Sequence, residues 1–268
     1  MLTVKIDSRE IPGFFIILIS FTGKLIRFNQ VLTMQKYAVL FILLLLAGCG
    51  PNENELLQEA RNQLSQDNFQ QALQPLNQVL ESQPENREAL NMRAVAYYGM
   101  ENFNQAVDDC TRAIAIDSTD YKPYYNRANA RQLLNQYDSA LQDYNKAISL
   151  RPNVRDLYVN RGVILFMKDQ YPSAVEDFNF AIGIDSAYHL SHFNKGKTHL
   201  AMGELVKAEA SLQQAINLKG DYAASYYWLG ITQLQQEKQE TACTYLQQAL
   251  ALGYPNAQQT VNRFCTGE

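Results

Sequence analysis

The sequence contains few residues that interrupt helices and no run of basic residues. Only 8 prolines and 13 glycines occur among 268 residues, which suits a helical protein. Apolar residues make up 47%, too many for a disordered chain. The net charge is −4, and the chain after residue 48 keeps 18 of the 23 basic residues and 25 of the 27 acidic residues. An acidic chain without a basic run matches a phosphate backbone poorly, so we expect no nucleic-acid partner.

The sequence shows no catalytic or metal-binding motif. His189, His192 and His199 lie close together, but no cysteine or acidic cluster accompanies them at metal-ligand spacing. Residues 196–198 match the end of a phosphate-binding loop, yet Ser191 stands where its first glycine is required. No serine lies in a Gly-x-Ser-x-Gly turn. We therefore predict no enzyme activity, no metal and no cofactor.

The N-terminal region has the parts of a secretory signal at residues 34–48. Lys36 precedes an apolar run at 38–46, and two small residues follow before Cys49. The apolar run is too short to span a bilayer comfortably. Residues 46–49, Leu-Ala-Gly-Cys, resemble the lipobox of bacterial lipoproteins. That resemblance implies cleavage before Cys49, lipidation of its thiol and acylation of its new amino group, leaving residues 49–52 as a lipidated tether.

Residues 1–33 do not fit this arrangement, because the signal would begin unusually far into the chain. A second apolar stretch at 11–20 precedes Lys24 and Arg27. We hypothesise that Met34 is the true start and that 1–33 is an N-terminal extension introduced by gene prediction.

Internal repetition is the strongest feature of the sequence. An alanine recurs at one constant interval without slippage, at Ala72, Ala106, Ala140, Ala174, Ala208 and Ala242. A small residue precedes each of these alanines by twelve positions, at Ala60, Ala94, Ala128, Gly162, Gly196 and Gly230. A bulky residue or cysteine follows each alanine, at Leu76, Cys110, Tyr144, Phe178, Leu212 and Leu246.

This order of small and bulky residues, and its period of about 34 residues, resemble the tetratricopeptide repeat (TPR), in which each unit is two antiparallel helices. The resemblance implies an all-α solenoid of six helix-turn-helix repeats, at 53–86, 87–120, 121–154, 155–188, 189–222 and 223–256. Small residues allow two helix backbones to approach closely, and neighbouring repeats stack to bury their apolar faces. Residues 257–268 are predicted to form a capping helix and tail, with Val261 and Phe264 on one face.

Three further cysteines follow Cys49. Cys110 occupies a buried repeat position and is expected to pack as a small apolar residue. Cys243 lies near the start of the last repeat's second helix, and Cys265 lies at the end of the predicted cap. If those two helices run antiparallel, the two sulfurs are neighbours. Two alternatives therefore stay open, a Cys243–Cys265 disulfide or two free thiols.

Charged residues also recur at the repeat period. Asp109, Asp143 and Asp177 form one series, and the other is Arg93, Arg127, Arg161 and Lys195. The two series suit either a charged ligand track or a ladder of ion pairs between repeats. We favour the ladder, because both series follow the stacking period.

In the TPR family the first helices of the repeats line a concave ligand groove. Asparagine recurs there, and an amide can hold an extended peptide backbone or stabilise stacking; both interpretations stay open. The candidate partner-binding residues are Lys122, Tyr125, Asn126, Asn129, Asn160 and Asn194.

These features predict a membrane-anchored scaffold or adaptor that binds a protein or peptide partner in the bacterial cell envelope. Gly50 follows the lipidated cysteine, rather than the aspartate that retains enterobacterial lipoproteins in the inner membrane, so we expect the outer membrane. The alternative is a ligand-binding lipoprotein that captures a peptide or a glycan. Fold analogy alone does not choose between them.

Overall fold

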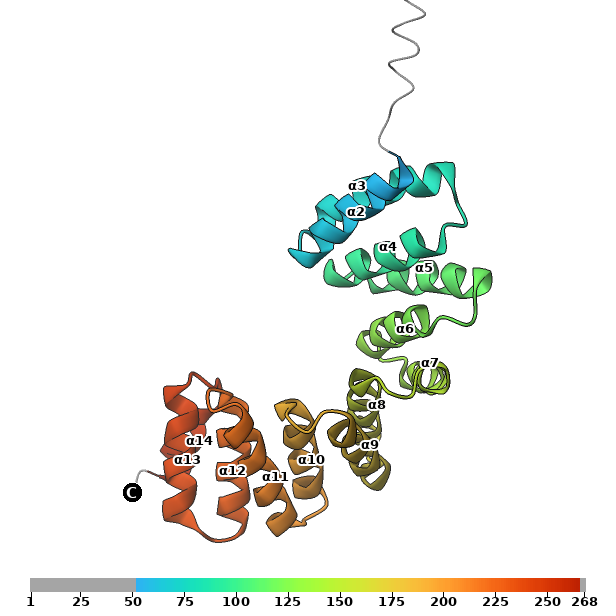
Figure 1. The fold of residues 1–268 in the computed structure, drawn as a ribbon. Coiled ribbons are helices and arrows are strands. Elements are labelled where there is room, and N and C mark those ends of the chain that lie inside the picture. The colour runs from blue at the N-terminus through green and yellow to red at the C-terminus, as the bar shows by residue number, and fades with distance from the viewer. Residues whose placement is uncertain (1–51, 266–268) are drawn as a thin grey trace, which may run out of the picture. The chain divides into compact units, whose positions relative to one another are not determined.

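A computed structural model describes residues 52–265 of the chain (Figure 1). The predictions for residues 1–33, 34–48 and Cys49 lie outside the described residues. The chain divides into two units, 1–55 and 56–268, and all described residues from Leu56 onward belong to the second. Within 52–265, no helix has both the length and the apolar character that crossing a membrane requires.

The described residues are all-α, as predicted, and contain thirteen helices without a strand. Six of them, the first members of successive helix pairs, are called A helices here: α2 (Glu53–Ser65), α4 (Arg87–Gly99), α6 (Tyr121–Leu133), α8 (Arg155–Met167), α10 (His189–Ala201) and α12 (Ala223–Gln235). Their partners are the B helices: α3 (Phe69–Ser82), α5 (Phe103–Ile116), α7 (Tyr137–Leu150), α9 (Tyr171–Ile184), α11 (Leu205–Leu218) and α13 (Gln239–Ala251). The last helix is α14 (Ala257–Phe264).

A residue in the left-handed backbone conformation ends the turn after each A helix. Its φ lies between 57° and 73°, and it recurs once in every repeat, as Asp67, Glu101, Asn135, Asp169, Gly203 and Glu237. The next residue's N–H returns to a carbonyl of the A helix, as from Asn68 to Gln63 at 2.9 Å. This is the C-terminal helix stop that glycine usually provides. Here the sequence gives little sign of it, because only Gly203 is glycine.

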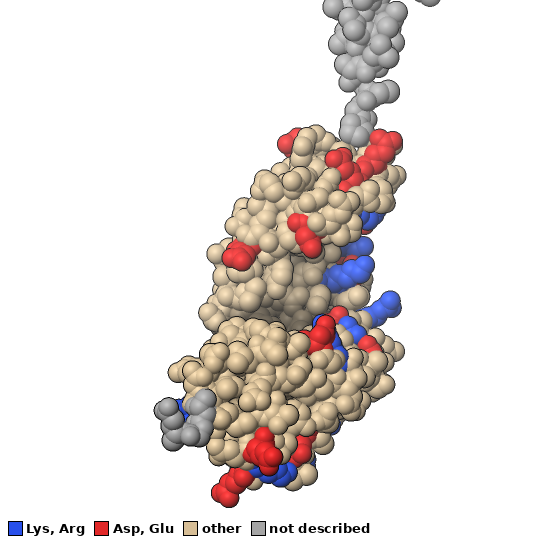
Figure 2. All heavy atoms as spheres, turned by 90° about the vertical axis from the view of Figure 1, so that its left-hand side faces the viewer, with Lys and Arg blue, Asp and Glu red and all other residues tan. Residues whose placement is uncertain are grey.

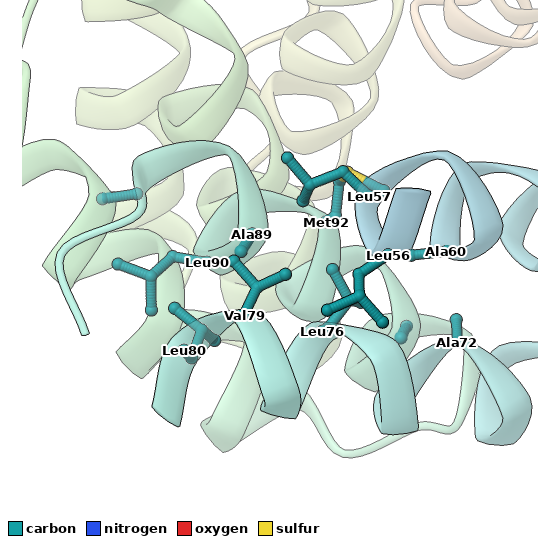
Figure 3. Close-up of a cluster of buried hydrophobic side chains, with 12 residues drawn as sticks. Leu56, Leu57, Ala60, Ala72, Leu76, Val79, Leu80, Ala89, Leu90 and Met92 are labelled. Carbon is teal, nitrogen blue, oxygen red and sulfur yellow. The ribbon is translucent and has the colours of Figure 1, made fainter. Parts of the chain in front are cut away.

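The repeated small residues lie where A and B helices approach most closely. The periodic alanines and the bulky residues that follow them are at most 1% exposed. A Cβ atom added at Gly196 would lie 2.7 Å from the Leu212 side chain and 3.1 Å from its backbone nitrogen. The first of the resulting clusters joins α2, α3 and α4 through residues that include Leu57, Leu76 and Met92 (Figure 3).

Contacts between helices establish the stacking order. Each helix from α3 to α13 contacts the next along the chain, and each A helix from α4 to α10 also contacts the next A helix. No pair of B helices among the described residues makes comparable contacts. The A helices from α4 to α12 therefore form one contiguous surface, on which residues at the same position of successive repeats fall into rows.

Helix α14 packs against α13 and covers the end of the stack. Ala257 and Val261 are buried, whereas Phe264 is 37% exposed. The prediction that Val261 and Phe264 share the buried face is therefore wrong for Phe264. The buried face uses the i, i+4 pair that a helix places one turn apart.

Substituting one glycine in a close contact and one in open space separates packing from helix propensity. We expect Gly196→Ala to lower the free energy of unfolding by about 1–3 kcal/mol, because the new methyl group overpacks against Leu212. Gly183→Ala, whose Cβ meets nothing within 4 Å, should raise it by up to about 1 kcal/mol. Urea unfolding followed by circular dichroism measures both, and effects of the same sign would contradict this packing account.

Candidate functional site

The predicted groove residues all lie on A helices. Lys122, Tyr125, Asn126 and Asn129 belong to α6, Asn160 to α8 and Asn194 to α10. Lys122 is exposed, and the other five are partly buried. The structure thus places them on one continuous surface, although it does not place them in equivalent surroundings.

Two of the recurring asparagines bond to the preceding A helix. Asn126 donates from Nδ2 to Oδ1 of Asn91 at 2.9 Å. Asn160 donates from Nδ2 to Oδ1 of Asn129 at 3.0 Å and to the Tyr125 hydroxyl at 3.4 Å. Buried amides are stable when hydrogen-bonded in this way. These contacts favour the stacking interpretation for Asn126 and Asn160.

Asn194 differs from the other two. The residues that would serve as its acceptors, 35 and 31 positions earlier, are Val159 and Val163, which have no polar side-chain atom. Within 52–265 the Asn194 side chain has no hydrogen bond, and only its backbone carbonyl accepts one, from Thr198 at 2.7 Å. Its amide is therefore available to a ligand.

Lys197 was missed as a site residue, because the sequence offered only its place in a false phosphate-binding motif. Its ammonium nitrogen lies 5.3 Å from the ring centroid of Phe166, 5.6 Å from that of Phe193 and 5.1 Å from that of Trp228. These rings come from three successive A helices, α8, α10 and α12. Burial lowers the pKa of Lys197. No described carboxylate or hydrogen-bond acceptor pairs with it, so cation–π attraction is its main compensation.

The periodic charges form ion pairs, but these lie within repeats and not between them. Arg127 donates from Nε and Nη2 to the two carboxylate oxygens of Asp143, at 2.9 and 2.7 Å. Arg93 and Arg161 bind Asp109 and Asp177 in the same forked geometry. Each pair joins the A and B helices of one unit, so the expectation of pairs between repeats is wrong.

Contacts between repeats are made instead by the third guanidinium nitrogen of these arginines. Nη1 of Arg93, Arg127 and Arg161 donates to the preceding B helix, at Asn77, Thr111 and Asn145. The paired aspartates are only 2–3% exposed. Because breaking one partner of a buried pair leaves an uncompensated charge, this series stabilises the stack rather than forming a ligand track.

The three histidines have separate surroundings. Nδ1 of His199 lies 2.6 Å from a carboxylate oxygen of Glu204, and Nε2 of His192 lies 3.0 Å from the carbonyl oxygen of Ser186. His189 packs edge-on against Tyr222. In the described part of the chain, no group of three or more His, Cys, Asp or Glu side chains is placed to hold a metal.

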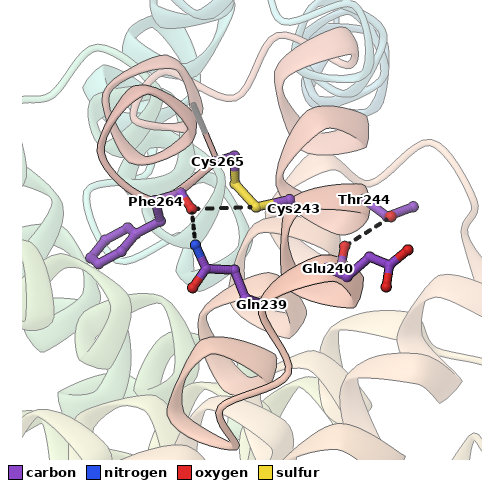
Figure 4. Close-up of a disulfide and its surroundings, with 6 residues drawn as sticks. All are labelled: Gln239, Glu240, Cys243, Thr244, Phe264 and Cys265. Carbon is purple, nitrogen blue, oxygen red and sulfur yellow. Dashed lines mark hydrogen bonds between the residues drawn. A yellow bond between two sulfur atoms is a disulfide. The ribbon is translucent and has the colours of Figure 1, made fainter. Parts of the chain in front are cut away.

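The C-terminal cysteines lie together at the end of the stack (Figure 4). The sulfurs of Cys243 and Cys265 are 2.04 Å apart in a disulfide that ties α14 to α13. Next to it, Gln239 donates from Nε2 to the Phe264 carbonyl oxygen. Cys110 is free and buried, and burial raises the pKa of its thiol to about 12, so it packs as an unreactive apolar group.

Comparisons with known proteins agree with this architecture. Family models of the tetratricopeptide repeat match residues 88–120, 121–154 and 193–257. No curated protein matches the chain significantly. The repeated helix pairs define an α-solenoid. The chain belongs to the TPR family.

Several solved structures share the fold. One is PilF from Pseudomonas aeruginosa, with 20% identity over 79% of this chain and 97% of that one, and a TM-score of 0.69. Another is YrrB, with 19% identity over 70% of this chain and 97% of that one, and a TM-score of 0.58. The Cut9–Hcn1 complex has a TM-score of 0.70 with 17% identity over 80% of this chain and 43% of that one. At these identities the likeness establishes the fold alone.

The disulfide leads to a prediction about the linkage and the stability of the C-terminal cap. Non-reducing peptide mapping of the purified protein should recover Cys243 and Cys265 in one linked pair of peptides. Replacing both by serine should lower the stability of the C-terminal end by about 3 kcal/mol, because the closed loop restricts the unfolded chain. Cys110→Ser leaves the disulfide intact and serves as the control for linkage. Recovery of Cys243 and Cys265 as free thiols would contradict the prediction.

Proposed function

We propose that this protein is a lipid-anchored adaptor of the bacterial cell envelope that binds a protein partner on its A-helix surface. The lipidated residue is Cys49, and the proposed location is the outer membrane. The lipobox-like sequence supports the anchor, and the TPR fold supports a role in protein interaction rather than catalysis.

The observation that carries the binding proposal is the unpaired amide of Asn194 on the A-helix surface. Among the asparagines of its row, Asn126 and Asn160 are held by neighbouring side chains, whereas the side chain of Asn194 has no hydrogen-bond partner among residues 52–265. A partly buried amide is best satisfied when another chain supplies its hydrogen bonds.

Proteins of similar fold provide analogies for such a role. YrrB is a TPR protein with an unusual peptide-binding site. The Cut9–Hcn1 structure is a hetero-tetramer. By analogy, we assign the binding of a peptide segment or a partner chain to the A-helix surface here.

The anchor is tested by labelling cells with a clickable fatty acid. The wild-type chain should incorporate the label, because its thiol and new amino group become acylated, and Cys49→Ser should not. Cys110→Ser is the matched control and should be labelled like the wild type. Fractionation of the labelled protein should place it in the outer membrane. Equal labelling of wild type and Cys49→Ser, or recovery in the inner membrane, would contradict the corresponding part of the proposal.

The binding surface is tested by crosslinking in whole cells followed by pull-down. A specific partner captured by the wild type should be largely lost from Asn194→Ala and from the Asn126→Ala, Asn160→Ala, Asn194→Ala triple variant. The single variant is decisive, because Asn126 and Asn160 also support stacking. Asn179→Ala, an exposed amide on helix α9, is the control and should retain the partner.

Thermal unfolding must first show that each variant is folded. A partner that all variants retain would move the contact away from the A helices. The absence of any specific partner, together with saturable binding of a small peptide or glycan by the purified protein, would favour the alternative of a ligand-binding lipoprotein.

A further inference from the structure

Lys197 is a positive charge that the described protein leaves without an anion. It is partly buried, and three aromatic rings from α8, α10 and α12 surround its ammonium at 5.1–5.6 Å. Ion pairs are common elsewhere in the stack, where Arg93, Arg127 and Arg161 each have a forked aspartate. A desolvated ammonium next to apolar rings binds an anion more strongly than an exposed lysine does, because water screens it less.

The surroundings of Lys197 along the stack are apolar. Its row on the A helices contains Val163 in the preceding repeat and Ile231 in the following one. Both are partly exposed. A ligand that follows this row therefore meets apolar surface, one positive charge and apolar surface again. Figure 2 views the left-hand side of Figure 1. On this face few charged side chains lie in the hollowed middle, and most lie toward the edges.

A polar contact for a main chain lies beside the charge. Asn194 and Lys197 are three residues apart on α10, so their side chains are neighbours on the helix surface. The unpaired Asn194 amide can donate to a carbonyl oxygen and accept from an N–H of one peptide unit. An ammonium and a free amide side by side are suited to a carboxylate carried on a peptide.

We propose that the surface formed by Phe166, Asn194, Lys197 and Trp228, over the buried ring of Phe193, binds a peptide segment of a partner protein through one carboxylate side chain flanked by apolar residues. The inference deepens the proposed adaptor function and rests on it. Lys197 binds the carboxylate, Asn194 binds the adjacent peptide unit, and the apolar flanks contact the rows on either side.

The spacing of the partner residues follows from helix packing. Helices in contact lie about 8–10 Å apart, and an extended chain advances about 3.3–3.6 Å per residue. The apolar residues should therefore stand about three positions before and three positions after the acidic one. This predicts a pattern of apolar, two spacers, Asp or Glu, two spacers and apolar.

Trp228 provides a direct readout of this site, because it is the single tryptophan of the chain. Quenching of its fluorescence by iodide, relative to neutral acrylamide, reports the local positive potential. At low salt, Lys197→Gln should reduce this ratio by roughly half, since the ammonium is the nearest cation to the ring. Lys146→Gln, an exposed lysine on helix α7, should leave the ratio unchanged. An unchanged ratio in Lys197→Gln would overturn the electrostatic basis of the proposal.

The peptide itself is tested with a phage-displayed library of random peptides long enough to span three A helices. The library is selected on the full chain in detergent micelles. The selected peptides should be enriched in the predicted pattern, and their binding should change the fluorescence of Trp228. Replacing the acidic residue of a selected peptide by its amide should weaken binding to the wild type roughly 10-fold, as expected for a charge-assisted hydrogen bond.

Variants of Lys197 decide whether that preference belongs to this residue. Lys197→Gln should bind the acidic peptide and its amide form equally, and Lys197→Arg should restore the preference. Selected peptides without an acidic residue, or a preference that persists in Lys197→Gln, would overturn the inference while leaving the adaptor function intact. A library that yields no binding peptide would contradict peptide binding by the adaptor itself, and the inference would fall with it.

Discussion

The close approach of helix backbones at the recurring small residues is the constraint on which the rest of this structure depends. A methyl group or a hydrogen at these positions allows an A helix to meet its B helix. The bulky residue four positions after each periodic alanine then fills the remaining space, and the next pair covers what one pair leaves exposed. Because the repeat period never slips, every A helix presents its side chains in the same register.

That register gives the A-helix surface its chemistry. Asn126 of α6 donates a hydrogen bond to Asn91 of α4, and Asn160 of α8 donates one to Asn129 of α6. Further along, Val159 and Val163 replace the acceptors, so the Asn194 side chain has no hydrogen-bond partner in the described part of the chain. The buried aspartates also end after Asp177, because Ser211 occupies the next position of that series. In the same repeat fold, the asparagines from α4 to α8 are thus hydrogen-bonded to one another, whereas the asparagine on α10 is not.

Much of this architecture could be predicted from sequence, because small and bulky residues at a fixed period report directly on backbone distance. The helical class, the TPR family and the burial of the repeated residues are confirmed. The ion pairs of Arg127 and its equivalents were expected between repeats, because the period alone does not distinguish a contact within a repeat from one between repeats. Lys197 was missed because its significance comes from Phe166 and Trp228, which lie on other helices.

The central claim is that the A-helix surface around Lys197 meets the partner. Replacing Phe166 by p-benzoyl-phenylalanine puts a photocrosslinker on that surface, and replacing Phe180 puts the same group on the B helix α9, where the native ring is 60% exposed. Irradiation of living cells should crosslink one specific protein from position 166 and not from position 180. Crosslinking of that protein from position 180 alone would contradict the account.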